Sequence, residues 1–221
     1  MAIISDTLYE AYFQNLLSGK RRQTSEIVQT LMNEQIPIPV LYEKLMQKSM
    51  YQVGDLWEKN QLSVATEHMA TAITEGLLNQ VYPQFERGES VGKCAVVGSV
   101  EKELHQVGAK MVCDILELNG WEAFYLGAST PTSEMIGFIE EKRPDIIGLS
   151  MSIYFNLPGL EKMIAAIRSA FPDIPIIIGG QGLSTNGTQI AKKGQKVYYI
   201  STLEDLTTFL DKPEFNPRRQ R

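Results

Sequence analysis

Short apolar runs alternate with helix-length segments from about residue 89 to the end of the chain. The runs are rich in β-branched and aromatic residues, which favour strands, and they are CAVVG (94–98), EAFYL (122–126), DIIGLS (145–150), IPIII (174–178) and KVYYI (196–200). The helix-length segments cover residues 105–119, 133–142, 158–171, 185–193 and 203–210. Such alternation predicts an α/β fold with a doubly wound parallel sheet of five strands, covered by helices on both faces.

The first part of the chain has a helical period instead. Residues 5–18 and 24–33 are predicted to form two short amphipathic helices. A longer helix follows Pro39 and reaches Trp57, and a fourth begins after Ser63, whose side chain is suited to an N-cap. Four helices with short connections predict an antiparallel four-helix bundle.

A polar segment rich in helix-breaking residues, 83–90, separates the two patterns. We therefore expect a helical bundle domain over residues 1–88 and an α/β domain over residues 89–221. Doubly wound sheets bind ligands at the carboxyl ends of their strands, so the loops after positions 98, 150 and 178 are the expected binding region.

The composition excludes several classes of protein. Lys and Arg number 21 and Asp and Glu number 26, so the net charge is -5, which is unsuited to nucleic-acid binding through phosphate contacts. The two cysteines, Cys94 and Cys113, are too few for a disulfide framework or a structural zinc cluster, and we expect them to be structural thiols. The sequence shows neither a signal peptide nor an uncharged apolar run of the ~18 residues that a membrane helix needs. We expect a cytoplasmic protein that contacts no membrane.

The loop after the first strand carries a carboxylate and an imidazole two residues apart, Glu103 and His105. It matches no phosphate-binding loop. Residues two apart in an extended segment project to the same side, so Glu103 can accept a hydrogen bond from one ring nitrogen of His105 and leave the other as a metal ligand. Gly108 would let a bulky ligand approach the backbone. The alternative is a histidine at a helix N-terminus beside a capping glutamate.

Two further loops at the same edge are poor in large side chains. The third strand ends near Ser150 and Ser152, which are small hydroxyl residues. The fourth ends at Gly179 and Gly180, where a ligand can lie against the backbone. The three loops together predict a deep slot beside a metal-bearing ligand.

This set of residues resembles the cobalamin-binding domain. The resemblance covers roughly residues 91–183 and rests on the ExHxxG motif, the Ser150 loop and the Gly-Gly pair, and on the flanking segments MVCDILELNGWEAFYLG, RPDIIGLSMS and AIRSAFPDIPIIIGG. It implies a Rossmann-like (flavodoxin-like) fold and base-off cobalamin, in which the protein histidine replaces the cofactor's own benzimidazole below the cobalt.

The resemblance also implies a role for each site residue. His105 would be the lower axial cobalt ligand and Glu103 its hydrogen-bond partner, and the residues that line the slot for the nucleotide tail would be Ser150, Ser152, Gly179 and Gly180. Two positions depart from the pattern of many corrinoid enzymes. They have Asp where this chain has Glu103 and Leu where it has Ser152, so the resemblance does not define the tail contacts at Ser152.

The helical part contains the only other histidine, His68. Trp57 ends one predicted helix, and Glu67 and His68 lie in the first turns of the next, so we expect all three at one end of the bundle. The alternative is a core tryptophan, a glutamate that favours the helix start, and a core or surface histidine.

The spacing W-x9-EH resembles the helical cap of adenosylcobalamin-dependent photoreceptor regulators. That resemblance implies that Trp57 packs against the upper axial adenosyl group and that Glu67 and His68 lie close to it. Some of those regulators have a histidine directly after the tryptophan. Here that residue is Glu58, so only His68 could ligate cobalt from above.

The sequence therefore leads us to expect a cobalamin-binding sensor of the photoreceptor type, with adenosylcobalamin as its cofactor. Light or ligand would rearrange the cap, and the output would be a homo-oligomer or a partner signalling protein, because no catalytic residue is identified. We expect no DNA-binding domain, because the first predicted helix begins within the first few residues.

Three alternatives stay open. The chain could be a corrinoid carrier that holds methylcobalamin between methyltransferases. It could be a photoreceptor that stands alone and also binds a bilin, although no residue identifies a bilin site. It could also be a degenerate domain that acts only as an interaction module.

Overall fold

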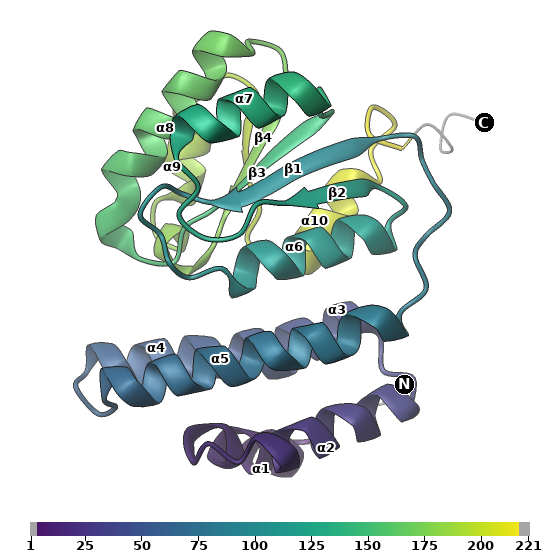
Figure 1. Ribbon diagram of the computed structural model, residues 1–221, viewed down its shortest axis with the longest axis vertical. Helices are drawn as coiled ribbons and strands as arrows, with labels where there is room; N and C mark the ends of the chain where they lie inside the picture. The colour runs from purple at the N-terminus through teal and green to yellow at the C-terminus, as the bar shows by residue number, and fades with distance from the viewer. Residues whose placement is uncertain (1–3, 217–221) are drawn as a thin grey trace. The chain divides into compact units, whose positions relative to one another are not determined.

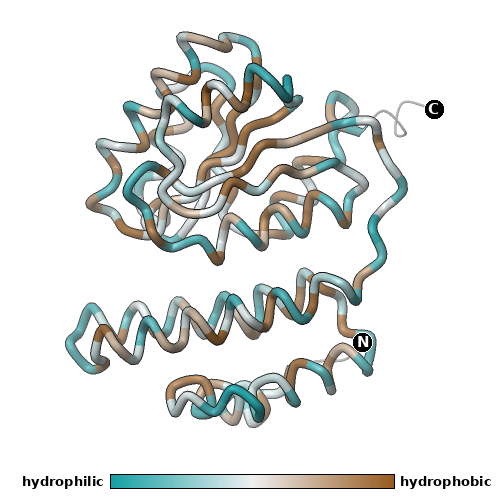
Figure 2. Tube along the Cα trace, in the orientation of Figure 1, coloured by the Kyte–Doolittle hydropathy of each residue, from teal (hydrophilic) through white to brown (hydrophobic). Residues whose placement is uncertain are grey.

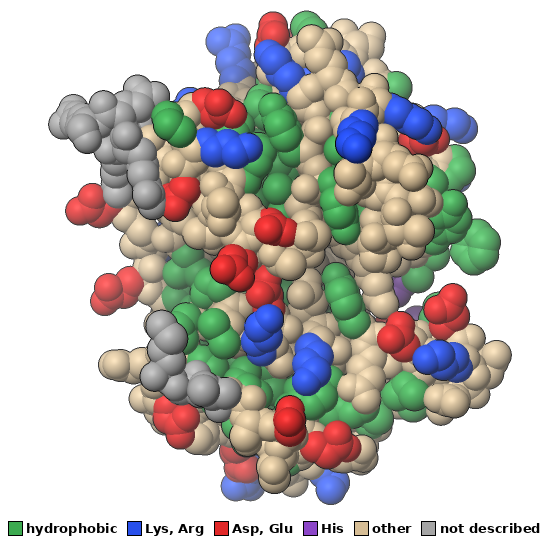
Figure 3. All heavy atoms as spheres, turned by 180° about the vertical axis from the view of Figure 1, so that it is seen from behind, with side chains coloured by type: hydrophobic (Ala, Val, Ile, Leu, Met, Phe, Trp, Pro, Cys, Tyr) green, Lys and Arg blue, Asp and Glu red, His purple; other side chains and the backbone are tan. Residues whose placement is uncertain are grey.

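The computed structural model describes residues 4–216, and the chain divides into an N-terminal unit that ends at Phe85 and a C-terminal unit that begins at Glu86 (Figure 1). Within the described residues, we find no helix with the length and the apolar character that crossing a membrane requires. On the face drawn in Figure 3, acidic and basic side chains are interspersed.

The N-terminal unit is a bundle of helices, as predicted. Its elements are α1 (Asp6–Leu17), α2 (Arg21–Asn33), α3 (Ile38–Leu41), a π-helical segment (Tyr42–Gln47), α4 (Lys48–Glu58), α5 (Val64–Val81) and a 3-10 turn (Tyr82–Gln84). The third predicted helix is thus a continuous helix with a π-helical segment, which the apolar period alone does not distinguish from regular α-helix. The N-cap at Ser63 is confirmed, because its side chain accepts a hydrogen bond from the Thr66 backbone N–H at 3.1 Å.

The C-terminal unit contains a parallel sheet in the order β2-β1-β3-β4-β5. Its strands are β1 (Cys94–Ser99), β2 (Glu122–Tyr125), β3 (Ile146–Ser150), β4 (Ile176–Gly179) and β5 (Val197–Tyr199). Its helices are α6 (Val107–Leu118), α7 (Thr132–Lys142), α8 (Leu157–Ala170), α9 (Gly187–Lys193) and α10 (Leu203–Leu210). This strand order is that of flavodoxin-like doubly wound proteins, so the predicted fold class is confirmed.

Helices cover both faces of the sheet, with α6 and α10 on one face and α7, α8 and α9 on the other (Figure 1). The strands are apolar along most of their length because both their faces are covered (Figure 2). The core between the sheet and α7, α8 and α9 is made of buried aliphatic side chains, which include Val96, Ile147, Ile176, Met135, Ile139, Leu160 and Met163.

Helix α6 begins at Val107, two residues later than the predicted start at position 105. The Ser99 hydroxyl donates a hydrogen bond of 3.0 Å to the backbone carbonyl of His105, which holds this residue in the loop. His105 therefore precedes the helix, and its side chain stays at the carboxyl edge of the sheet.

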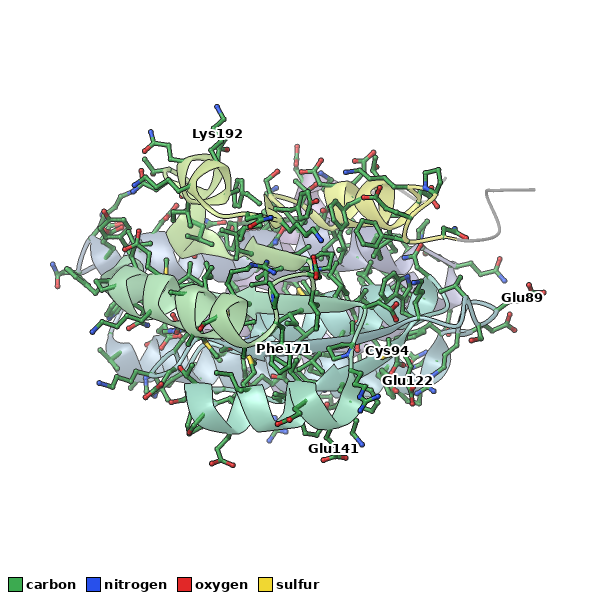
Figure 4. All side chains as sticks on the ribbon, turned by 90° about the horizontal axis from the view of Figure 1, so that it is seen from above. Glu89, Cys94, Glu122, Glu141, Phe171 and Lys192 are labelled. Carbon is green, nitrogen blue, oxygen red and sulfur yellow. The ribbon has the colours of Figure 1, made fainter. Side chains whose placement is uncertain are left out.

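One of the two cysteines, Cys94, lies at the amino end of β1, away from the carboxyl ends of the strands. Cys94 and Glu122 are paired positions of β1 and β2 and lie close together in Figure 4. Burial raises the pKa of the Cys94 thiol, and it also raises the pKa of the buried Cys113 thiol. A raised pKa keeps a thiol protonated and unreactive, which agrees with structural roles for both.

Candidate functional site

The carboxyl ends of β1, β3 and β4 form one continuous row. Ser99 is paired with Ser150, and Ser150 is paired in turn with Gly179. The connections from β1 and β3 leave toward opposite sides of the sheet, because β2 flanks β1 on one side and β4 flanks β3 on the other. This point of divergence is where doubly wound sheets bind ligands.

Glu103 and His105 interact as the sequence predicts. The Glu103 Oε1 atom lies 2.5 Å from His105 Nδ1, and it accepts a second hydrogen bond from the His105 backbone N–H at 2.9 Å. A carboxylate can only accept, so Nδ1 carries a ring proton, and in the neutral imidazole the lone pair is on Nε2. Glu103 is fully buried, whereas the His105 side chain is 38% exposed. The imidazole is thus held through Nδ1 by a buried carboxylate.

The second carboxylate oxygen of Glu103 connects this loop to the loop after β3. Oε2 accepts hydrogen bonds from the backbone N–H groups of Ser152 at 3.0 Å and Ile153 at 2.9 Å, and from Asn156 Nδ2 at 3.0 Å. Asn156 is a functional candidate that the sequence analysis did not identify. The sequence offers one indication of its role: residues 151–160 contain no charged residue, and Asn156 is the one amide side chain among them.

These hydrogen bonds determine the charge state of Glu103. Burial by itself raises the pKa of the carboxyl group, but the hydrogen bonds from His105, Ile153 and Asn156 outweigh it and lower the pKa to about 2. Glu103 is therefore a carboxylate at neutral pH. A buried carboxylate beside Nδ1–H is the arrangement that orients metal-ligating imidazoles in proteins.

The loop after β2 supports the same segment from the other side. The Ser129 hydroxyl accepts a hydrogen bond from the Lys102 backbone N–H at 3.0 Å, and the Ser129 backbone N–H donates to the Glu103 carbonyl at 2.9 Å. Lys102 and Ser129 both have positive φ, 71° and 51°, which side chains other than glycine rarely adopt. The loop that carries His105 is thus held in a constrained conformation by its neighbours on both sides.

The glycines at this edge have different surroundings. A Cβ atom at Gly108 would lie 3.4 Å from Ser150 Oγ, an ordinary contact, so a Cβ atom there would not clash with the chain. At Gly180, with φ of 107°, a Cβ atom would lie 2.4 Å from the Met151 carbonyl oxygen. Gly180 is therefore required by the approach of the chain's own backbone. That Gly179 and Gly180 also line a ligand slot stays a prediction, as do the roles of Ser150 and Ser152.

In the N-terminal unit, Trp57, Glu67 and His68 lie at one end of the bundle, as predicted. Trp57 is one residue from the end of α4, and the other two are in the first turns of α5. The Glu67 carboxylate accepts a hydrogen bond from the Thr71 hydroxyl at 2.9 Å and lies 3.5 Å from His68 Nε2. Trp57 is 40% exposed and the His68 side chain 74% exposed, so neither is a core residue. Their contact with a cofactor stays a prediction.

In sequence comparison, each of the two parts of the chain matches a family model. A family model described as a B12 binding domain matches residues 93–209, more than half of the chain, and a second one with the same description matches residues 8–82. Methionine synthase of Mycobacterium tuberculosis is 25% identical over 183 residues, which are 80% of this chain but 15% of that protein. This chain thus spans a small part of that relative.

Two other relatives match a larger share of their own length. Dimethylamine corrinoid protein 1 of Methanosarcina acetivorans is 28% identical over 145 residues, 63% of this chain and 68% of that protein. The HTH-type transcriptional repressor CarA of Myxococcus xanthus is 28% identical over 149 residues, 66% of this chain and 49% of that protein. The structure of the Methanosarcina barkeri monomethylamine corrinoid protein superimposes with a TM-score of 0.79 over 93% of this chain and 98% of that one. At 15% identity, this similarity shows a shared fold.

Proposed function

Because the chain belongs to the B12 binding domain family, we propose that it holds cobalamin as the corrinoid carrier of a methyl-transfer system. The observation that carries the proposal is the buried Glu103 carboxylate, which fixes the His105 ring with Nε2 as the acceptor atom. When bound, the cobalt would supply the atom that accepts a methyl group from a methylated substrate held by one methyltransferase and gives it to an acceptor held by another.

The residues at the site fit such a cofactor. His105 would supply one ligand to the cobalt, whose other ligands would belong to the cofactor. Glu103 holds the ring through Nδ1, and Ser99 holds the His105 backbone. The resemblance implies that Ser150, Gly179 and Gly180 line the slot for the nucleotide tail. In this arrangement the chain binds and orients the cofactor, and a methyltransferase partner would supply the catalytic groups.

The relatives favour the carrier over the sensor that the sequence led us to expect. Methionine synthase and dimethylamine corrinoid protein 1 are named for methylated compounds, and the latter is named as a corrinoid protein. The resemblance to photoreceptor regulators has weaker support, from the CarA repressor at 28% identity. The bilin has no support from these relatives, and the proposal does not include it.

A second candidate, an adenosylcobalamin sensor, is favoured by one observation. Trp57 and His68 are exposed at the same end of the bundle, beside the Glu67 carboxylate that Thr71 orients. An exposed indole is suited to stacking on an adenine ring. In this case a homo-oligomer or a signalling partner would carry the output.

The ligand assignment is tested by the spectrum of the bound cofactor. Purified protein would be loaded with hydroxocobalamin, and the visible spectra of wild type, His105→Ala and His68→Ala compared. We expect loss of the histidine-ligated spectrum in His105→Ala alone. A wild-type spectrum in that variant would refute His105 as the ligand.

The choice between carrier and sensor is tested by comparing the binding of two cobalamins that differ in their upper axial group. A carrier is expected to bind methylcobalamin and adenosylcobalamin with similar Kd and to keep its oligomeric state after green light. A strong preference for adenosylcobalamin, together with a change of oligomeric state on illumination, would favour the sensor instead.

A further inference from the structure

Two residues in the loops after β1 and β2 have a backbone conformation that residues with a side chain rarely adopt. Lys102, after β1, has a φ of 71°, and Ser129, after β2, has a φ of 51°. The other described residues with positive φ, glycines apart, lie in connections that follow a helix, where left-handed residues are common. They are Gln35, Asn60, Arg143 and Lys196. Lys102 and Ser129 follow strands instead, so the ending of a helix does not explain their conformation.

These two residues contact each other, and Ser129 also contacts Glu103. The Ser129 hydroxyl accepts a hydrogen bond from the Lys102 backbone N–H at 3.0 Å, and the Ser129 backbone N–H donates to the Glu103 carbonyl at 2.9 Å. On its other side, the Glu103 backbone N–H donates to the Val100 carbonyl at 2.8 Å. Both backbone polar groups of Glu103 are thus paired, which fixes the direction in which its side chain leaves the chain.

A second contact joins the same two loops. The Glu101 Oε2 atom accepts hydrogen bonds from the Thr132 backbone N–H at 3.2 Å and from the Thr132 hydroxyl at 2.9 Å. Pro131, the N-cap of α7, makes no capping hydrogen bond with its side chain, so Glu101 satisfies the helix start in its place. The segment that ends β2 and begins α7 is therefore tied to the loop after β1 just ahead of the imidazole.

We propose that Ser129 is a positioning residue for His105, which fixes Lys102 and Glu103 so that the imidazole is held in its ligating orientation before the cofactor binds. This inference rests on the proposed function, since it assumes that a corrinoid cobalt binds at His105. A strained backbone persists where its surroundings over-determine it, and such residues cluster at ligand sites. Ser129 acts through Glu103, and we assign it no contact with the cofactor.

The test measures the Kd of hydroxocobalamin by titration of the visible spectrum. Ser129→Ala and Ser129→Gly both lose the hydroxyl and are both expected to bind about fivefold more weakly than wild type, because a smaller fraction of the protein holds the loop in the binding conformation. Glycine relieves the positive φ, so Ser129→Gly should have a higher Tm than Ser129→Ala. A merely structural role would make Kd follow Tm.

Ser90→Ala is the matched control. The Ser90 hydroxyl also accepts a hydrogen bond from a backbone N–H, that of Gly92 at 3.2 Å, but it precedes β1 at the amino end of the sheet. This variant is expected to keep the wild-type Kd. An equal loss of affinity in Ser90→Ala and Ser129→Ala would assign the effect to general destabilisation and overturn the inference.

The His105→Ala background separates positioning from direct contact. If Ser129 acts through His105, adding Ser129→Ala to His105→Ala should leave Kd unchanged. Hydrogen exchange of the cofactor-free protein gives a second measurement. The amides of Glu103 and His105, which donate to the Val100 carbonyl and to Glu103 Oε1, are expected to exchange about fivefold faster in Ser129→Ala than in wild type.

Each other outcome has a defined meaning. A wild-type Kd in both Ser129 variants, or in Ser129→Gly alone, would overturn the inference, and so would a full loss of affinity from Ser129→Ala in the His105→Ala background. If His105→Ala binds no corrinoid, the exchange rates decide, and unchanged rates in Ser129→Ala would overturn the inference. Wild-type protein that binds no corrinoid would reject the proposed function, whereas the exchange rates would still show whether Ser129 holds the loop.

Discussion

The carboxylate of Glu103 contacts His105 with one oxygen and Asn156 with the other, so a single buried side chain connects the loops that follow β1 and β3. The orientation of the imidazole therefore depends on a residue 53 positions away from Glu103 in the chain. The first two predictions concern this connection.

Replacing Glu103 with Gln is expected to destabilise the fold and to weaken histidine ligation. Five N–H groups donate to the two oxygens of the carboxylate. In Gln an NH2 group, which is a donor, replaces one of these oxygens, so at least one buried N–H group loses its acceptor. An unsatisfied buried donor costs about 1–3 kcal/mol. Urea unfolding would measure the destabilisation, and the spectrum of bound hydroxocobalamin would report the ligation. Wild-type stability with a wild-type spectrum would show that the carboxylate is not needed at this position.

Replacing Asn156 with Ala is expected to cost about 1 kcal/mol of stability, because one hydrogen bond to a charged group is lost while two backbone donors remain on the same oxygen. Corrinoid binding should weaken as well. Asn119→Ala is the matched control, since its side-chain amide donates to the Ile115 carbonyl at 2.8 Å within the last turn of α6. It should lose similar stability and keep the wild-type Kd. Equal effects of the two variants on Kd would argue against a positioning role for Asn156.

Replacing Gly180 with Ala is expected to destabilise the protein by about 2–4 kcal/mol. The φ of 107° at this position is poorly tolerated by residues with a side chain, and the new Cβ atom would overlap the Met151 carbonyl. Gly137→Ala in α7 is the control, because a Cβ atom there meets nothing within 4 Å. It should stabilise the protein by about 0.5–1 kcal/mol through helix propensity. Thermal or urea unfolding of both variants tests the contrast, and a neutral Gly180→Ala would contradict it.

The fold class and the Glu103–His105 contact are accessible from the sequence because they depend on local patterns. The alternation of apolar runs and helices determines the fold class, and a spacing of two residues places the carboxylate beside the ring. The contacts of Asn156 and Ser129 connect loops that only the folded sheet brings together, so no local pattern predicts them. Gly180 shows a third case: glycine after a strand was expected to make room for a ligand, which stays a prediction, and the structure shows that it makes room for the backbone of Met151 as well.

Replacing Trp57 with Ala distinguishes the two candidate functions. Because Trp57 is 40% exposed, near the end of α4, its removal should cost about 1 kcal/mol of stability or less, so a large effect on binding would reflect a direct contact. If the chain is a sensor, the variant should bind adenosylcobalamin at least about tenfold more weakly and methylcobalamin unchanged, since only the adenosyl group offers an aromatic surface for the indole. If the chain is a carrier, the ratio of the two Kd values should be the same in wild type and variant. Trp57→Phe retains an aromatic ring, so it should keep most of the wild-type preference for adenosylcobalamin over methylcobalamin. If Trp57→Phe loses this preference as Trp57→Ala does, stacking on the indole is not its source.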